Sequence, residues 1–423
     1  MKMILGSFAV CLALNALADD LTISGVMVQQ RWPWSRLVDI DYVLTCDVTQ
    51  TMDIAVEAYD GSTLLTLPAN SFSGDLYGVQ RGARRIVWDP TVTACTNSGV
   101  LPEFRVALAP SPSPLYMVID LSGGTSATSY PVSNYVAEAD VPGGVTNGLY
   151  KTTSLLLRRI PANDFKMGDS VPPTLPVTLT KAFYAGVYEV TQKQWQQVMG
   201  DVRNWPSKWN NTEYRDTRPV EQVSYYDIRE NPANSDDAAV NWPSNSAVTA
   251  NSFMGRVRDK TGIDGFDLPT EAQWECLCRA GTQTYYNDDG ATPGNTTSNA
   301  QMDVLGRYQY NGGKCWNGAS WVDPGQSTTA TGATATVGSY LPNAWGLYDT
   351  HGNVWEWCRD WHTSSLGTAA VTDPAGAGSG SSRVFRGGSW ANTAADCRSA
   401  SRNGSVPSFR NYNIGFRLVR TLP

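Results

Sequence analysis

From about residue 151 onward, the chain is dense in tryptophan and glycine and has few segments with the apolar spacing of a helix. Two segments are exceptions, 191–199 and 269–280, and each opens with a threonine that can cap a helix, Thr191 and Thr270. A backbone this irregular must be held by buried tryptophans, by disulfides or by bound ions. The pattern therefore predicts an α+β domain with long polar surface loops at 229–251 and 283–336.

The first part of the chain has a different pattern. From Leu21 to about Ile119, short alternating stretches are broken by turn residues, which predicts an all-β sandwich. Residues 82–90 resemble the late strand of immunoglobulin-like modules in secreted bacterial proteins, so we expect an immunoglobulin-like module without chemistry of its own. The expected organisation is then a sandwich at 19–120, a Gly/Ser-rich linker at 121–150 and a second domain at 151–423.

The N-terminus has the organisation of a secretory signal peptide over residues 1–18. Lys2 precedes an apolar run at 3–14, and the small residues Ala16 and Ala18 form a cleavage site. The run is too short for a membrane anchor, because a bilayer span needs about twenty apolar residues. We expect export to a secreted or periplasmic location, with no membrane span.

Composition argues against several classes of function. The formal net charge is -7, without a basic cluster, which argues against nucleic-acid binding. His351 and His362 are the only histidines of the chain. Catalytic zinc, non-haem iron and histidine-based triads all use imidazole as ligand or base, so none of them is expected.

The cysteines suggest disulfides. The chain has eight, of which Cys11 lies in the expected signal peptide, so an odd number remains in the mature chain. In an oxidising compartment most should pair, leaving at least one thiol over. Cys46 with Cys95 is the natural pair in the first domain, although other connectivities stay open.

Sequence blocks after residue 165 carry a family resemblance. In order along the chain they are 165–168, 188–191, 219–224, 268–275, 343–357, 386–390 and 413–417. Together they resemble the formylglycine-generating enzymes, also called sulfatase-modifying factors. The resemblance implies an irregular α+β fold related to C-type lectins.

Most residues of these blocks have a structural interpretation. The aromatic side chains Trp355, Trp357, Trp390 and Phe416 are expected in the core. Gly387 and Gly388 should permit a backbone geometry closed to other residues. Glu275 and Arg417 are expected to form structural ion pairs or hydrogen bonds.

The resemblance also implies a structural calcium ion. Its ligands would be the side chains of Asp349 and Glu356 and the backbone carbonyls of Gly352 and Val354. Hard oxygen ligands crowded on a short loop suit calcium. The alternative is that the two carboxylates only bind backbone amides.

The match fails at the family's catalytic site. Active members hold copper(I) between two cysteines and use oxygen to oxidise a substrate cysteine. The corresponding positions here are Asn392 and Cys397. An amide is a poor ligand for soft copper(I), so copper and oxidase activity are not expected. Cys397 is then either the second catalytic position or half of a disulfide. Cys358 is the leading disulfide partner, because inactive-looking relatives carry both cysteines.

The stretch 390–417 also resembles the variable region of retroelement-diversified proteins, which display a binding face on this fold. Its small polar residues are also what an ordinary surface loop would contain. The predicted ligand-binding residues are Ala391, Asn392, Thr393, Asp396, Ser399, Ser401, Asn403, Ser405, Ser408 and Tyr412. We therefore expect a non-catalytic protein that binds a protein or glycan through its 391–412 face. The alternative is a formylglycine-generating oxidase acting on sulfatase-type cysteine substrates.

Overall fold

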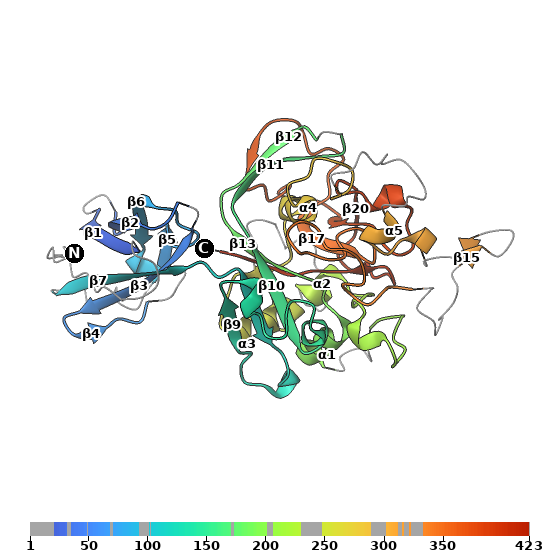
Figure 1. The fold of residues 1–423 in the computed structure, drawn as a ribbon, viewed down its shortest axis with the longest axis horizontal. Helices are drawn as coiled ribbons and strands as arrows, with labels where there is room; N and C mark the ends of the chain where they lie inside the picture. The colour runs from blue at the N-terminus through green and yellow to red at the C-terminus, as the bar shows by residue number, and fades with distance from the viewer. Residues whose placement is uncertain are drawn as a thin grey trace. The chain divides into compact units, whose positions relative to one another are not determined.

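A computed structural model describes the chain as two units (Figure 1). One unit comprises Met1–Pro114 with Leu422–Pro423, and the other comprises Leu115–Thr421. The expected signal peptide lies outside the described residues. Those residues are 21–31, 35–48, 50–67, 71–92, 101, 103–170, 173–200, 206–229, 248–288, 302–311, 315–316, 321–322 and 333–422.

The described strands of the first unit form two sheets, and a single helical turn at Pro90–Val92 follows β6. One antiparallel sheet has the order β1-β2-β6-β5, and a second has the order β4-β3-β7. Both sheets contribute to one core, in which Trp88 stacks on Phe104 with ring centroids 5.2 Å apart. The strands are β1 Thr22–Gln30, β2 Val38–Thr45, β3 Met52–Asp60, β4 Thr63–Leu64, β5 Phe72–Gly74, β6 Gly82–Trp88 and β7 Phe104–Pro112. A two-sheet β unit is present, and its immunoglobulin-like character remains a prediction.

A six-stranded sheet organises the second unit, in the order β14-β22-β13-β10-β8-β9. Its strands are β8 Tyr116–Asp120, β9 Val132–Tyr135, β10 Ser154–Ile160, β13 Phe183–Gly186, β14 Phe266–Asp267 and β22 Val419–Thr421. The predicted linker at 121–150 is wrong, because β9 lies within it and pairs with β8. Leu121, Tyr130, Val141 and Tyr150 are buried, so this Gly/Ser-rich stretch is part of the domain.

The predicted helices are confirmed. Helix α1 (Gln192–Met199) begins at a capping box formed by Thr191, and α4 (Glu271–Arg279) begins at one formed by Thr270. The sequence analysis missed α3 (Phe253–Thr261), which Ser252 caps. Two single-turn helices are α2 Tyr225–Ile228 and α5 Met302–Leu305. Within the described residues, no helix is long and apolar enough to cross a membrane.

Smaller sheets contain some of the sequence blocks that carry the family resemblance. One has the order β20-β19-β17-β21 and another has the order β11-β12-β18. Their strands are β11 Asn163–Met167, β12 Leu175–Leu179, β17 Trp355–Trp361, β18 Val371–Thr372, β19 Arg383–Arg386, β20 Arg402–Ser405 and β21 Ile414–Gly415, and a separate pair is β15 Cys315–Trp316 with β16 Trp321–Val322. The four aromatic residues predicted to lie in the core are all buried there.

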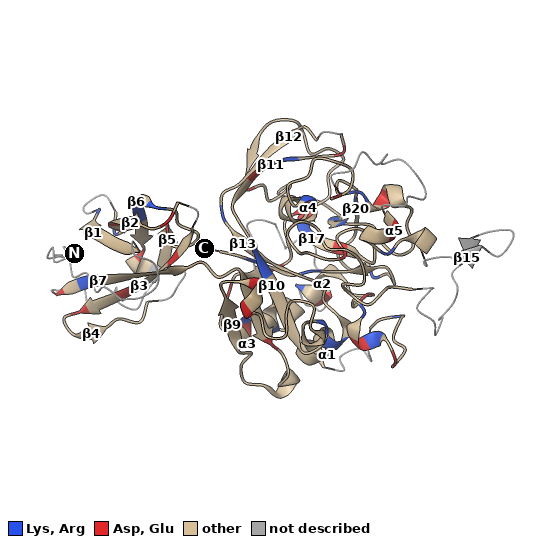
Figure 2. Ribbon diagram, viewed as in Figure 1, with Lys and Arg blue, Asp and Glu red and all other residues tan. Residues whose placement is uncertain are grey.

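Buried arginines hold the irregular backbone of this unit. Arg386 donates from Nη1 to the carbonyl oxygens of Ala400 and Ser401, each at 2.6 Å, and its Nη2 pairs with Glu275. Arg417 pairs with Glu356 in the same way, which confirms the structural roles predicted for Glu275 and Arg417. Elsewhere Lys and Arg are mixed with Asp and Glu along the described elements (Figure 2).

The predicted Cys358–Cys397 disulfide is wrong in this structure, where both are buried free cysteines. The two residues belong to different core clusters. Cys358 packs with Trp274, Cys278 and Val384, whereas Cys397 packs in the cluster of Tyr286. Cys46 is also unpaired and buried, and its suggested partner Cys95 lies outside the described residues.

Candidate functional site

The segment predicted to bind a ligand begins at the tight turn that ends β19. Gly387 and Gly388 have φ angles of 96° and 74°, in the region that favours glycine. A Cβ on Gly388 would lie 2.5 Å from Sγ of Cys397, so no larger residue fits there without a shift. This close approach confirms the backbone role predicted for the two glycines. The loop that follows the turn therefore packs directly against the buried Cys397.

By the resemblance drawn from the sequence blocks, Asn392 corresponds to the first of the two copper-binding positions of the family. Its Oδ1 accepts a hydrogen bond from Nε1 of Trp355 at 2.9 Å and another from the hydroxyl of Ser389. Its backbone carbonyl accepts from the amide of Gln309 at 2.9 Å. The Asn392 side chain therefore ties the loop to β17, which is a structural contact.

Cys397, for which the resemblance allows the second of these positions, is fully buried. It ends the short helical turn Ala394–Cys397, and its thiol donates weakly to the carbonyl of Ser389 at 3.9 Å. Burial raises the pKa of the Cys397 thiol, with a further contribution from the nearby Asp396. Because the thiolate is the nucleophile and the metal ligand, this environment disfavours both roles.

The burial of Cys397 leads to a first prediction. In the native protein, iodoacetamide is expected to leave Cys397 and Cys358 unmodified, because both thiols are buried. In urea both should be alkylated, as measured by peptide mass spectrometry. A peptide pair linked by a Cys358–Cys397 disulfide, or rapid native labelling of Cys397, would contradict the structure.

Not all of the predicted ligand-binding residues can contact a ligand. Ser399 is fully buried, so its prediction as a surface contact is wrong. The side chain of Asp396 accepts from the amide and the hydroxyl of Thr393, at 3.3 and 2.8 Å, and closes a helix cap. With Asn392 also bound internally, the side chains left to face a partner are those of Ala391, Ser401, Asn403, Ser405, Ser408 and Tyr412.

An aromatic cluster that the sequence analysis missed supports this segment. Trp209 packs edge-on against Trp390 with centroids 5.2 Å apart, and Tyr412 lies 5.6 Å from Trp390. The ammonium of Lys208 lies 4.8 Å from the ring of Trp209 and 4.5 Å from that of Tyr412. Trp209 lies in a stretch of sequence without helical or strand periodicity. Nothing in the local pattern therefore predicted that it packs against Trp390.

The residues predicted to bind calcium do not fit that ion in this arrangement. Both carboxylate oxygens of Glu356 are bound by Arg417, at 2.8 and 2.9 Å, and Oε2 also accepts from Nε1 of Trp274 at 2.7 Å. A guanidinium already occupies the place that a cation would need. In addition, the described residues contain no group of three or more His, Cys, Asp or Glu side chains that could hold a metal ion.

The other residues of the predicted calcium site are Asp349, Gly352 and Val354. The amide of Gly352 donates to the carbonyl of Gly387, and that of Val354 donates to Oε1 of Glu189, so the backbone carbonyls predicted as calcium ligands take no part in these two bonds and their role stays a prediction. Asp349 accepts from the amide of Gly338 at 2.6 Å through Oδ2, whereas its buried Oδ1 has no hydrogen-bond partner. Burial raises the pKa of Asp349 to about 6.

Glu189 is an acid to which the sequence analysis gave no role. It is fully buried, and burial together with nearby Asp349 and Glu356 raises its pKa well above its usual range. Its oxygens accept from the amide of Val354 and from Nδ2 of Asn353, at 3.1 and 2.6 Å. The sequence shows that Glu189 belongs to the block at 188–191. It could not show that this side chain contacts Asn353 and Val354, which lie far away along the chain.

These features define a loop-rich domain of α+β type in which buried arginine–carboxylate pairs hold the loops together. Residues 149–422 match the family model of the sulfatase-modifying factor enzyme 1-like domain, and the chain belongs to that family. The match confirms the resemblance drawn from the sequence blocks.

Three relatives illustrate the match. A formylglycine-generating enzyme of Streptomyces coelicolor is 39% identical over 161 residues, which cover 36% of this chain and 46% of that protein. The chaperone protein LppX of Paenibacillus barcinonensis is 34% identical over 212 residues, covering 47% and 69%. The formylglycine-generating enzyme of Bos taurus is 28% identical over 326 residues, covering 70% and 82%. The chain thus covers less than half the length of the Streptomyces enzyme.

Among solved structures, Treponema denticola variable protein 1 is similar at 29% identity and a TM-score of 0.46, covering 64% of this chain and 96% of that one. PvdO from Pseudomonas aeruginosa is similar at 24% identity and a TM-score of 0.42, covering 63% and 94%.

Proposed function

We propose that this protein is an exported, non-catalytic member of its family that binds a protein or glycan partner through the exposed positions of residues 391–412. The observation that carries the proposal is Asn392, whose amide stands where active relatives have a copper-binding cysteine. Its carbonyl oxygen is held by Trp355 and Ser389. Export is proposed from the organisation of residues 1–18.

The chemistry of cysteine oxidation supports a non-catalytic role. A copper(I) site of the family type needs two thiolates, and soft thiolate ligands are what select that ion. Here one position is an amide, and the remaining thiol, that of Cys397, is buried with a raised pKa. Neither position offers a thiolate at the surface to a metal or a substrate.

The composition of the exposed positions supports binding. Asn403 and Ser408 are exposed, and Tyr412 is half-buried on the support of Trp390. Tyrosine contributes large contact area at low entropic cost, while serine and asparagine supply adaptable hydrogen bonds. A rigid aromatic base beneath a polar loop is suited to recognition.

A formylglycine-generating oxidase is the alternative, and the Streptomyces and Bos taurus relatives that carry that name favour it. The two functions predict different results with copper. Copper(I) titration of the purified protein, followed by incubation with oxygen and a cysteine-containing sulfatase-type peptide, is expected to give neither stoichiometric copper binding nor aldehyde. Aldehyde formation, detected by hydrazone mass spectrometry, would overturn the non-catalytic proposal.

A matched variant sharpens this experiment. Asn392→Cys supplies the missing thiol at the first position and should bind copper(I) more tightly than the wild-type protein does. Wild-type protein that binds copper as tightly as this variant would favour the oxidase.

For the binding role, Tyr412→Ala should abolish capture of whichever member of a glycan or peptide array the wild-type protein retains. Asn211→Ala, an exposed asparagine outside the segment, should not.

A further inference from the structure

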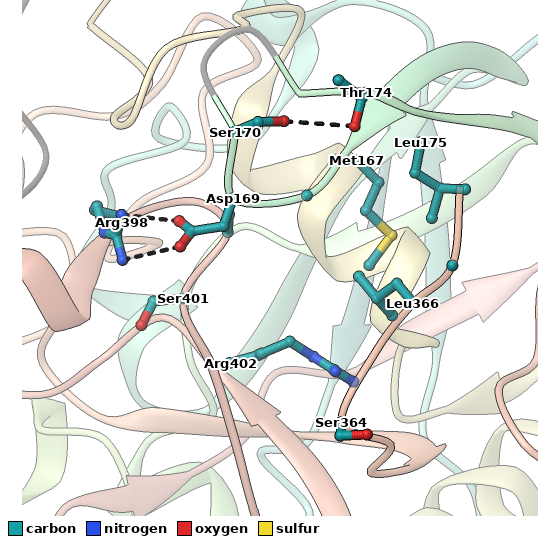
Figure 3. A pocket seen from close by; sticks show the side chains of 13 residues that line it. Met167, Asp169, Ser170, Thr174, Leu175, Ser364, Leu366, Arg398, Ser401 and Arg402 are labelled. Atoms are coloured by element: carbon teal, nitrogen blue, oxygen red, sulfur yellow. Dashed lines mark hydrogen bonds and ion pairs between the residues drawn. The ribbon is translucent and has the colours of Figure 1, made fainter. Parts of the chain in front are cut away.

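A pocket of about 380 Å³ opens beside residues 398–402 (Figure 3). It lies between the loop that follows β11, the segment that follows β17, and the turn that precedes β20. Neither Asn392 nor Cys397 lines it, so it is separate from the positions of the family's copper site. Its volume is near the lower end of the roughly 300–1,000 Å³ that small-molecule sites have, which suits a small ligand.

The walls of the pocket differ in character. Met167 and Leu175 are buried parts of the main core, and Leu366 packs against the same core. In Figure 3 these three side chains lie on one side, while Arg398 and Ser401 lie on the other. A ligand that fills the space therefore meets aliphatic groups at one end and hydrogen-bond donors at the other.

The two arginines of the pocket are not equivalent. Arg402 binds both carboxylate oxygens of the buried Glu271 at 2.7 Å and also donates to the carbonyl of Thr363. Its guanidinium is therefore committed to the protein. Arg402 therefore lines the pocket but does not offer its charge to a ligand.

Arg398 is the cation that a ligand can use. Its Nε donates to the carbonyl of Ala395 at 2.8 Å, which fixes the orientation of the guanidinium. Its remaining nitrogens pair with Asp169 at 2.8 and 3.3 Å, and the Asp169 side chain is 60% exposed. The Arg398 side chain is 20% exposed, and water reaches the pair from the side of Asp169. Pairs that water screens in this way contribute little to stability, so a ligand carboxylate can replace that of Asp169 at small cost. It would meet a guanidinium already presented for bidentate binding.

We propose that this pocket binds a ligand with one carboxylate beside a branched aliphatic group. The carboxylate takes the place of Asp169 on Arg398, and the aliphatic group packs against Met167, Leu175 and Leu366. Both a free acid and the C-terminal residue of a polypeptide carry this chemistry. The pocket shares Ser401 with the face proposed to bind a partner, but a small acid can bind here whether or not that face has a partner.

The test is a calorimetric titration of the full chain with N-acetyl-L-leucine, with N-acetyl-L-leucinamide as the uncharged probe. The acid should bind and the amide should not. Arg398→Gln should weaken binding of the acid at least about tenfold, because a charge-assisted contact is lost. Asp169→Asn should strengthen it up to about fivefold, because the competing carboxylate is gone. Arg215→Gln, a matched surface arginine that pairs with Asp216, should change nothing.

Equal binding of acid and amide would overturn the proposal, and so would unchanged affinity in a folded Arg398→Gln protein. Absence of binding by both the wild-type protein and Asp169→Asn at millimolar acid would also overturn it. A ten-residue peptide with a C-terminal leucine distinguishes the sources. Tighter binding of the peptide identifies a chain terminus, and equal binding identifies a free acid.

Discussion

Replacing Arg417 with methionine is expected to lower the free energy of unfolding by about 3–5 kcal/mol, the usual cost of leaving one member of a buried ion pair uncompensated. Arg417 is fully buried and binds both oxygens of Glu356. It also donates to the carbonyls of Gly186 and Tyr348, each at 2.8 Å. Methionine fills much of the volume but removes every one of these bonds. The measurement is urea unfolding followed by tryptophan fluorescence.

Two further proteins make this result interpretable. Arg398→Met removes a partly exposed arginine from a surface pair and should cost less than about 1 kcal/mol. The double variant Glu356→Gln, Arg417→Met should recover part of the loss, because it also removes the uncompensated charge. An Arg417→Met protein within 1 kcal/mol of wild type would contradict the role assigned to the pair.

Stabilisation of the wild-type protein by added calcium would contradict the poor fit of the predicted calcium ligands.

Local signals explain which elements could be predicted. The Thr-x-x-Gln capping boxes before α1 and α4 lie beside apolar residues with helical spacing, so both helices were visible. Helix α3 was missed because it has only a short apolar face, of which Phe253, Met254 and Val257 are buried. Tertiary packing, rather than local propensity, stabilises that helix.

The origin of the domain's rigidity could be predicted only in part. The sequence indicated that an irregular backbone needs tryptophans, disulfides or ions, and the tryptophans are indeed buried. The structure has free buried cysteines instead of the expected Cys358–Cys397 pair. Arg386 and Arg417 bind the carbonyl groups that such loops leave without partners. Which distant carbonyl an arginine reaches is a property of the fold, and no local pattern encodes it.

The candidate site shows the same limit. The expectation that copper is not bound rests on Asn392, a substitution that is visible in the sequence itself. The burial of Ser399 did not, because a serine in a polar stretch has the same local pattern whether its side chain faces solvent or core. Asp169 and Leu366 meet Arg398 in the pocket from segments far apart in the sequence, so the pocket could not be predicted either.

Glu221→Gln is expected to remove a large part of the pH dependence of stability between pH 5 and pH 8. Glu221 is fully buried, and burial raises its pKa to about 8. One oxygen accepts from the amide of Trp209 at 3.0 Å, and the other has no hydrogen-bond partner. Because the folded pKa lies above the unfolded value, the folded state binds more protons in this range. Stability from this group is present below the unfolded pKa and is lost as pH rises towards 8.

The loss expected from Glu221 alone is roughly 3 kcal/mol between pH 5 and pH 8, at 1.36 kcal/mol per unit of pKa difference. Urea unfolding at several pH values measures it. Glutamine keeps an oxygen for the Trp209 amide and cannot ionise, so the variant should match wild type near pH 5 and exceed it at pH 8. A shallower slope should remain, because burial also raises the pKa of Asp360 to about 7, that of Asp349 to about 6 and that of Glu189 well above its usual range. Glu213→Gln, at an exposed glutamate, should keep the full wild-type slope. Parallel slopes for wild type and Glu221→Gln would show that Glu221 is ionised in the folded protein near neutral pH, contrary to its environment.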